Sequence, residues 1–167
     1  MKRFFTAIIL LCIPVLLQNC KVNYSFTGIS TDAETVSIQY FPSVAPLAPP
    51  TYSQAFTESL KDIFLQQTNI ALVENNGELQ FEGEIVGYNN APVAVQGNEQ
   101  AALNRLTITV SVRFTNTLNE EDNFEKQFSK FEDYESTASL KQVEDQLIED
   151  INQQLTQDIL QSAIGNW

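Results

Sequence analysis

Hydrophobic and polar residues alternate along four stretches of the chain, which is typical of β-strands with one buried face. The clearest stretch covers residues 106–114, where every second residue is apolar and the residues between are Arg, Thr or Ser. Residues 35–41 and 79–85 alternate in the same way, and a returning strand follows within residues 124–134. Each strand is therefore expected to turn one row of side chains into a core and the other row outward.

Two other stretches have apolar residues three and four positions apart, which predicts amphipathic helices. The first helix covers residues 52–68, and the second runs from residue 140 to about Gly165. The S/T-x-x-Q pattern of a capping box precedes both helices, at 51–54 and 139–142, so we expect a box at each start.

The pattern is irregular at two places. Phe131 falls outside the alternation of the returning strand, which predicts a bulge or bend near Ser129. Residues typical of turns gather between the second and third predicted strands and indicate a loop there; they are Asn89, Asn90, Pro92, Gly97 and Asn98.

The predicted order of elements is β-α-β-β-β-α within a single domain at residues 34–167. A strand–helix–strand unit joins its strands in parallel, and the short later turns add antiparallel strands. Two helices with one apolar face each can cover only one side of the sheet. We therefore expect an α+β fold, a two-layer sandwich with a four-stranded mixed sheet and two helices on one face.

The other side of such a sheet is left uncovered, and residues 106–114 indicate what it presents. The polar row on and beside this strand has no carboxylates in an otherwise acidic protein and consists of Arg105, Thr107, Thr109, Ser111 and Arg113. This row is either an ordinary solvated face or a docking face. The two arginines are about 26 Å apart along the strand, too far to hold one phosphate together.

Composition argues against several classes of function. The 167 residues include 21 Asp and Glu against 9 Lys and Arg, a net charge of −12, so nucleic-acid phosphates would be repelled. The chain has no His, which removes Ser–His and Cys–His nucleophile pairs and the usual zinc ligands. No phosphate loop or nucleophile motif occurs. We expect no catalytic residue, no metal and no cofactor.

Two groups of carboxylates have the residue types of a catalytic pair or a cation site, but both are interpreted as solvated charges. Glu82 and Glu84 lie on one strand face with no sign of a pocket. The other group is a predicted hairpin turn that lacks the spacing of a calcium loop; it contains Glu120, Glu121, Asp122 and Glu125.

The N-terminal segment has the layout of a signal peptide. Lys2 and Arg3 precede an apolar run of about 14 residues, which is too short to cross a bilayer as a helix. Cys20 follows directly, and this arrangement resembles the lipobox of bacterial lipoproteins, with Leu17 in the preferred aliphatic position and Asn19 in place of a small residue. The resemblance implies a signal peptide at 1–19, acyl chains on Cys20 and a lipidated tether at 20–33.

Beyond the tether, the chain resembles the LptE family of outer-membrane lipoproteins. The segments that carry the resemblance are YSFTG at 24–28, VSIQYF at 36–41, FTESLKD at 56–62, GEIVGY at 83–88, PVA at 92–94 and NRLTITV at 104–110. The resemblance implies a non-enzymatic part of the lipopolysaccharide translocon. Such a protein sits on the periplasmic side of the outer membrane, plugs the LptD β-barrel and assists its assembly.

On this hypothesis the polar row from Arg105 to Arg113 contacts the barrel and Cys20 anchors the domain in the membrane. Lipopolysaccharide is a possible second partner, although a strongly acidic domain repels an anionic lipid. Two alternatives stay open. One is a different outer-membrane lipoprotein, acting as a barrel-assembly accessory or an envelope interaction module. The other is a carrier of a hydrophobic ligand held between helices and sheet.

Overall fold

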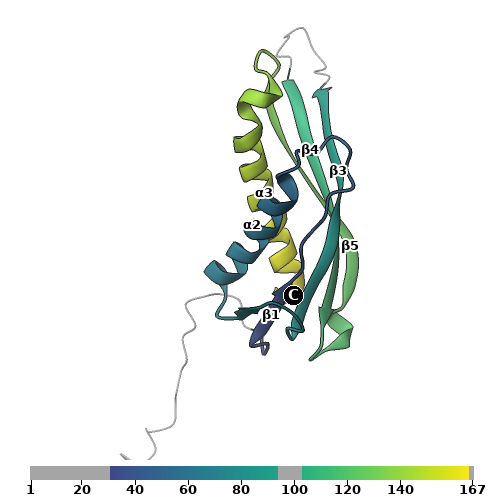
Figure 1. Ribbon diagram of the computed structural model, residues 1–167, viewed down its shortest axis with the longest axis vertical. Coiled ribbons are helices and arrows are strands. Elements are labelled where there is room, and N and C mark those ends of the chain that lie inside the picture. Colours follow the sequence, from purple (N-terminus) through teal and green to yellow (C-terminus); the bar gives the residue numbers. More distant parts are fainter. Residues whose placement is uncertain (1–30, 94–102, 166–167) are drawn as a thin grey trace, which may run out of the picture.

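The computed structural model describes residues 31–93 and 103–165 (Figure 1). The predicted signal peptide, Cys20 and most of the predicted tether lie outside these residues. The elements, in chain order, are β1 (Thr35–Ile38), α2 (Tyr52–Gln67), β2 (Ala71–Val73), β3 (Leu79–Val93), β4 (Leu103–Asn116), the 3₁₀ turn η2 (Glu120–Asp122), β5 (Phe124–Glu135) and α3 (Leu140–Ile164).

The α+β class and the two-layer arrangement are confirmed. The strands form one mixed sheet in the order β2-β1-β3-β4-β5, and both helices lie on the same side of it (Figure 1). β1 is parallel to both β2 and β3, whereas β3, β4 and β5 are antiparallel neighbours. The predicted number of four strands is wrong, because β2 adds a fifth strand at the edge beside β1.

A tight turn connects β2 to β3. Asn76 has a φ of 55°, in the left-handed region that Asn tolerates better than most residues. Gly77 packs against the backbone of β1, where a Cβ atom would lie only 2.5 Å from the nitrogen of Ser37. The Glu78 carboxylate then accepts hydrogen bonds from the backbone N–H groups of Glu34 and Thr35. The turn thereby holds the start of β1 in place.

The alternation predicted for residues 106–114 is confirmed in β4. Its apolar row is at most 1% exposed and packs under the helices; it consists of Leu106, Ile108, Val110, Val112 and Phe114. Aromatic rings continue the core across the layers, since Phe81 lies 5.0 Å from Phe64 of α2 and 4.8 Å from Phe114, centroid to centroid. This burial is the main stabilising contribution to the sandwich.

One predicted capping box is confirmed and the other is wrong. At the start of α3, the side-chain oxygen of Gln142 accepts a hydrogen bond from the backbone N–H of Ser139, completing the box. At the start of α2, Thr51 already has helical dihedral angles and its side chain caps nothing. The prolines before α2 form a turn in which Pro49 accepts from the N–H of Tyr52, so the box is not needed there.

The predicted bulge near Ser129 is also wrong. β4 and β5 pair without any shift of register, and the irregularity lies in β3 instead, between Ile85 and Gly87. β3 continues to Val93, so the predicted loop is wrong for Asn89, Asn90 and Pro92. Gly97 and Asn98 lie outside the described residues. Phe131 breaks the apolar alternation of β5 because it belongs to the outward row of that strand.

Candidate docking face

The sheet has a surface on the side away from the helices, called here the open face. β4 contributes its outward row to this face, in the alternation the sequence predicts, and these residues are Arg105, Thr107, Thr109, Ser111 and Arg113. Pairing with β3 and β5 places further outward residues beside them, namely Glu82, Glu84, Gly87 and Asn89 from β3 and Glu125, Gln127, Ser129, Phe131 and Asp133 from β5. The five predicted residues therefore lie in the middle of a three-stranded surface.

One end of the open face is acidic. Arg113 lies between two carboxylates of neighbouring strands, with Glu125 at 3.0 Å and Glu82 at 3.8 Å. These groups and Glu84 line a shallow hollow of about 340 Å³. The hydrogen bond from Arg113 to Glu125, with the charge of that carboxylate, raises the pKa of the guanidinium. Three carboxylates around one arginine leave this end with net negative charge.

The other end of the open face contains an ion pair and an aromatic ring. Arg105 donates two hydrogen bonds to Asp133, of 2.7 and 2.9 Å, in the fork geometry that suits a guanidinium and a carboxylate. Its guanidinium carbon also lies 3.6 Å from the centre of the Phe131 ring, which is 47% exposed. The hydrogen bonds from Arg105 hold the pKa of Asp133 below its usual value.

Small hydroxyl side chains occupy the middle of the open face. Thr109 and Ser129 share a hydrogen bond of 2.9 Å between their hydroxyl oxygens. Gly87 lies beside Thr109 on β3 and has no side chain to rise above the sheet. The middle is therefore low, uncharged and able to donate and accept hydrogen bonds.

The absence of carboxylates is a property of the β4 row alone, because β3 and β5 place Glu82, Glu84, Glu125 and Asp133 beside it. Both arginines are already paired with acidic residues of β3 and β5. Sequence inspection missed Phe131 and Asp133 as members of this face, because which β5 residue stands opposite which β4 residue depends on the turn between them. The alternation of β5 in the sequence was the signal that could have placed these two residues on the outward row.

The open face is better suited to contact than to reaction. Its two arginines are solvent-accessible and paired with carboxylates, and the perturbed pKa values on it are those of ion-paired groups. Among the described residues, no three His, Cys, Asp or Glu side chains are grouped to hold a metal ion. No described helix combines the length and hydrophobicity needed to cross a membrane.

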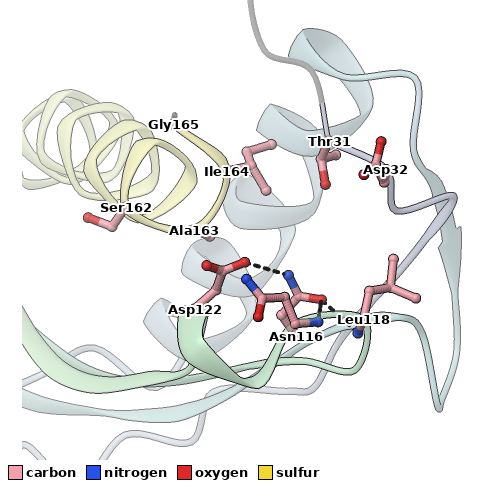
Figure 2. A pocket seen from close by; sticks show the side chains of 10 residues that line it. Thr31, Asp32, Asn116, Leu118, Asp122, Ser162, Ala163, Ile164 and Gly165 are labelled. Carbon is pink, nitrogen blue, oxygen red and sulfur yellow. Dashed lines mark hydrogen bonds between the residues drawn. The ribbon is translucent and has the colours of Figure 1, made fainter. Parts of the chain in front are cut away.

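A second hollow, of about 420 Å³, lies where the C-terminal end of α3 meets the chain entering at Thr31 and Asp32 (Figure 2). Asn116 organises one wall, since its amide group donates to Asp122 and its oxygen accepts from the N–H of Leu118. The carboxylate of Asp122 therefore helps to close the β4–β5 hairpin.

These features define a class, a two-layer α+β module with one face covered by helices and one polar face left for contact. The family model described as "LptE: Lipopolysaccharide-assembly" matches residues 33–163, and the chain belongs to that family. No curated protein matches the chain.

Solved structures share the fold at low sequence identity. A minor lipoprotein from Acinetobacter baumannii is 14% identical with a TM-score of 0.52, covering 78% of this chain and 93% of its own. The rare lipoprotein B from Shewanella oneidensis is 14% identical with a TM-score of 0.50, covering 77% and 92%. A hypothetical protein from Chlamydia trachomatis reaches 0.54 at 9% identity, covering 80% and 99%.

Proposed function

We propose that this protein is a non-enzymatic plug of an LptD-like outer-membrane β-barrel and that it assists the assembly of that barrel. Membership of a lipopolysaccharide-assembly family supports the pathway. The observation that carries the plug itself is the open face, a polar surface of three strands that no described part of the chain covers.

The chemistry of the open face fits the inside of a large barrel. Lumens of such barrels are polar, and their walls present side chains from alternate strand positions. Arg105 and Arg113 bring their own carboxylate partners, so a wall needs no matching charges to cover them. Thr109 and Ser129 offer hydrogen bonds at the low centre. Around Arg105 and at the low centre, this surface allows close contact without leaving a buried charge unpaired, whereas the end around Arg113 has more carboxylates than arginines.

The proposal includes a lipid anchor at Cys20, on the periplasmic side of the outer membrane. Two or more acyl chains hold a protein at a membrane firmly, whereas a single chain does not. The proposal assigns lipopolysaccharide no binding residue in this chain, because both arginines of the open face are already paired with carboxylates. The role proposed here is to fill the barrel and keep its wall in shape.

The test is recovery of the barrel with tagged variants from native envelopes in mild detergent. Thr109→Glu places a carboxylate at the centre of the open face. Burying it unpaired against a wall costs more than about 1.4 kcal/mol, so recovery falls roughly tenfold or more. Gln54→Glu adds the same charge on the exposed side of α2 and leaves recovery unchanged. Thermal unfolding of both variants stays close to that of the wild type.

Equal recovery of the barrel with Thr109→Glu would mean that the open face is only solvated surface. Recovery of no barrel with the wild-type protein, while other envelope complexes survive, would favour the alternative function. In that case the protein is an envelope interaction module or a barrel-assembly accessory that leaves the finished barrel.

A further inference from the structure

β5 lies at the edge of the sheet, and its outer side is free among the described residues. It is the last strand in the order β2-β1-β3-β4-β5, and its 12 residues, Phe124–Glu135, pair only with β4. Alternate residues of such a strand direct their N–H and C=O groups away from the sheet, where they can pair with a further strand. An edge of this length can therefore bind an extended segment of chain.

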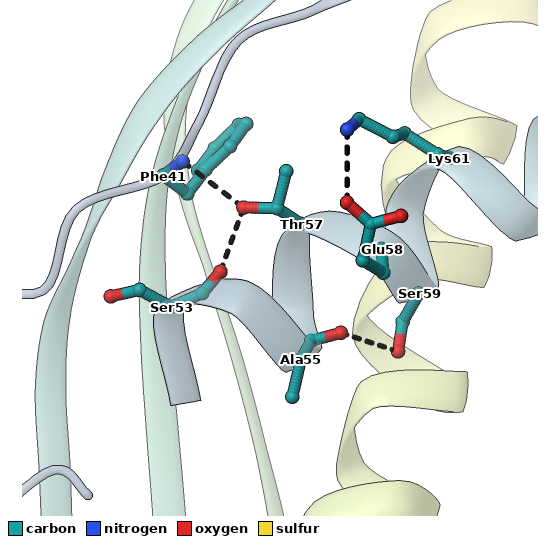
Figure 3. Close-up of polar contacts among 7 residues, drawn as sticks. All are labelled: Phe41, Ser53, Ala55, Thr57, Glu58, Ser59 and Lys61. Carbon is teal, nitrogen blue, oxygen red and sulfur yellow. Dashed lines mark hydrogen bonds and ion pairs between the residues drawn. The ribbon is translucent and has the colours of Figure 1, made fainter. Parts of the chain in front are cut away.

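The opposite edge of the sheet offers no comparable site among the described residues. β2 has only three residues, and the segment that leads from β1 to α2 already follows β3, where the N–H of Val44 donates to the carbonyl of Ile85. Figure 3 shows how this segment is tied to α2, since the N–H of Phe41 donates to the hydroxyl of Thr57. Among the described strands, β5 is therefore the one with a long edge available.

A shallow groove runs beside this edge, between β5 and α3. A hollow of about 440 Å³ is lined there by residues 126–129 of β5 and by Asp158, Gln161 and Ser162 of α3. Lys126 lies 4.7 Å from the centre of the Phe128 ring and donates a hydrogen bond to Ser162. Ser162 also lines the hollow at which the chain enters at Thr31, so the two hollows meet at this residue (Figure 2).

The chain that precedes Thr31 starts at the mouth of this groove. Thr31 lines the same hollow as Asp122, which is two residues ahead of the start of β5. The four residue steps from Thr27 to Thr31 span at most about 14 Å, enough to pass from the hollow to the first residues of β5. Residues 22–27 lie outside the described residues, and the position of Thr31 brings them within reach of the free edge.

The sequence of residues 22–27 suits such an edge. It reads VNYSFT, in which every second residue is apolar and the residues between are polar, the pattern of a strand with one buried face. No residue from 22 to 30 is charged, so this segment is not repelled by an acidic domain. Its polar row matches Gln127 and Ser129 on the outward side of β5, and its apolar row matches Phe128 on the other side.

We propose that residues 22–27 add to the free edge of β5 as a further strand of the sheet. The strand is antiparallel to β5, because the segment runs toward the hollow at Thr31 whereas β5 runs away from it. Its apolar row covers the groove between Phe128 and α3, and its polar row extends the open face by one strand.

Such a strand determines where Cys20 lies relative to the domain. Six strand residues extend about 20 Å, so Cys20 comes to lie beside the second half of β5 instead of at the end of a free chain. With the lipid anchor of the proposed function, the domain is then held close to the membrane and its orientation is restricted. This consequence rests on the proposed anchor, whereas the strand itself does not. The strand also closes an edge that would otherwise pair with strands of other chains.

The test is amide hydrogen exchange, followed residue by residue by NMR on the full chain purified from envelopes in detergent. Phe26→Asn removes a ring from the apolar row of the segment. Ser25→Asn is the matched control, because it introduces the same side chain at the neighbouring position, which faces the opposite side of a strand. In the wild type, the amides of residues 22–27 should exchange at least tenfold more slowly than in an unstructured chain.

Phe26→Asn should abolish this protection and also speed the exchange of alternate β5 amides at least tenfold, whereas Ser25→Asn should change neither. Unprotected amides at 22–27 in the wild type would overturn the strand. Loss of their protection in Phe26→Asn with unchanged exchange in β5 would overturn it as well, because the segment would then pair elsewhere. An equal effect of both variants would contradict the assignment of the two rows. The exchange is measured without the barrel, so a failure of the plug leaves these outcomes unaffected.

Discussion

At the scale of single residues, the hydroxyls of two tyrosines connect α3 to the rest of the fold, one to the other helix and one to the sheet. Tyr52 of α2 donates a 2.7 Å hydrogen bond to the side-chain oxygen of Asn152 on α3. Tyr88 of β3 donates a 2.6 Å hydrogen bond to Glu144 on the same helix, and the two tyrosine rings are 5.9 Å apart. A buried hydroxyl needs a hydrogen-bond partner within the protein, and here each partner lies on a different element from its tyrosine.

We predict that Tyr52→Phe destabilises the protein by about 1–3 kcal/mol, because the buried oxygen of Asn152 loses its donor. Asn152 is only 3% exposed, so water cannot replace the lost hydrogen bond without a rearrangement. The free energy of unfolding is measured by denaturant titration. Tyr40→Phe serves as the control, since that side chain is 58% exposed and its variant should change stability by less than about 0.5 kcal/mol.

The same tyrosine predicts a pH dependence. Burial raises the pKa of Tyr52 well above its ordinary value of 10.0, and the charge of Tyr88 raises it further. Because the pKa of Tyr52 is raised in the folded state, the contribution of its neutral hydroxyl to the free energy of unfolding is complete below pH 10. That contribution is lost as the pH rises above 10. The wild type should therefore lose stability above pH 10 more steeply than Tyr52→Phe. Parallel curves for the two proteins would contradict this assignment.

The open face shows what a single strand can and cannot reveal. The outward row of β4 follows from alternation alone, because each strand residue faces opposite to its neighbours. The partners of that row do not follow, because Asp133 meets Arg105 only in the register of this hairpin. Phe131 illustrates the same limit. It was interpreted as a bulge, since an apolar residue in a polar row has no explanation until Arg105 is seen above its ring.

At the scale of elements, length decided which predictions succeeded. Both helices and β4 are long enough for their periodicity to be unmistakable. The helices have nearly the predicted extents, and β4 (Leu103–Asn116) is longer at both ends than the predicted residues 106–114. β2 has only three residues, Ala71–Val73, too few for any alternation to be recognised. β3 continues through Asn89, Asn90 and Pro92, which are typical of loops, because pairing with β4 outweighs their weak strand preference.

The turn that follows β2 supports a prediction at this scale. Gly77→Ala would place a Cβ atom 2.5 Å from the nitrogen of Ser37 and 2.7 Å from the carbonyl carbon of Val36. Backbone atoms of β1 cannot move aside as a side chain can, so we expect a loss of about 1–3 kcal/mol in the free energy of unfolding.

Gly87→Ala is the matched control for this variant. Its new Cβ would lie 3.1 Å from the nearest atom, in the side chain of Thr109, which has room to adjust on the open face. We expect Gly87→Ala to be clearly milder than Gly77→Ala in the same denaturant titration. A similar loss in both variants would show that close approach to β1 is not the cause.

At the scale of the whole molecule, the net negative charge limits how the protein can be held at a membrane. Removal of residues 1–19 takes away Lys2 and Arg3, so the net charge changes from −12 to −14. Such a domain is repelled by anionic lipid and gains nothing from electrostatic attraction to a membrane. The proposed attachment to the outer membrane therefore relies on acyl chains rather than on charge.

This reasoning leads to a prediction about Cys20. Cys20→Ala removes the proposed site of acylation, and the variant should leave the outer-membrane fraction while its domain still folds, since Cys20 lies ahead of the described core. Cys12→Ala is the control, because Cys12 lies in the apolar run of the proposed signal peptide, and this variant should fractionate as the wild type does. Fractionation of envelopes with circular dichroism of the purified variants provides both readouts. Normal outer-membrane recovery of Cys20→Ala would refute lipid anchoring.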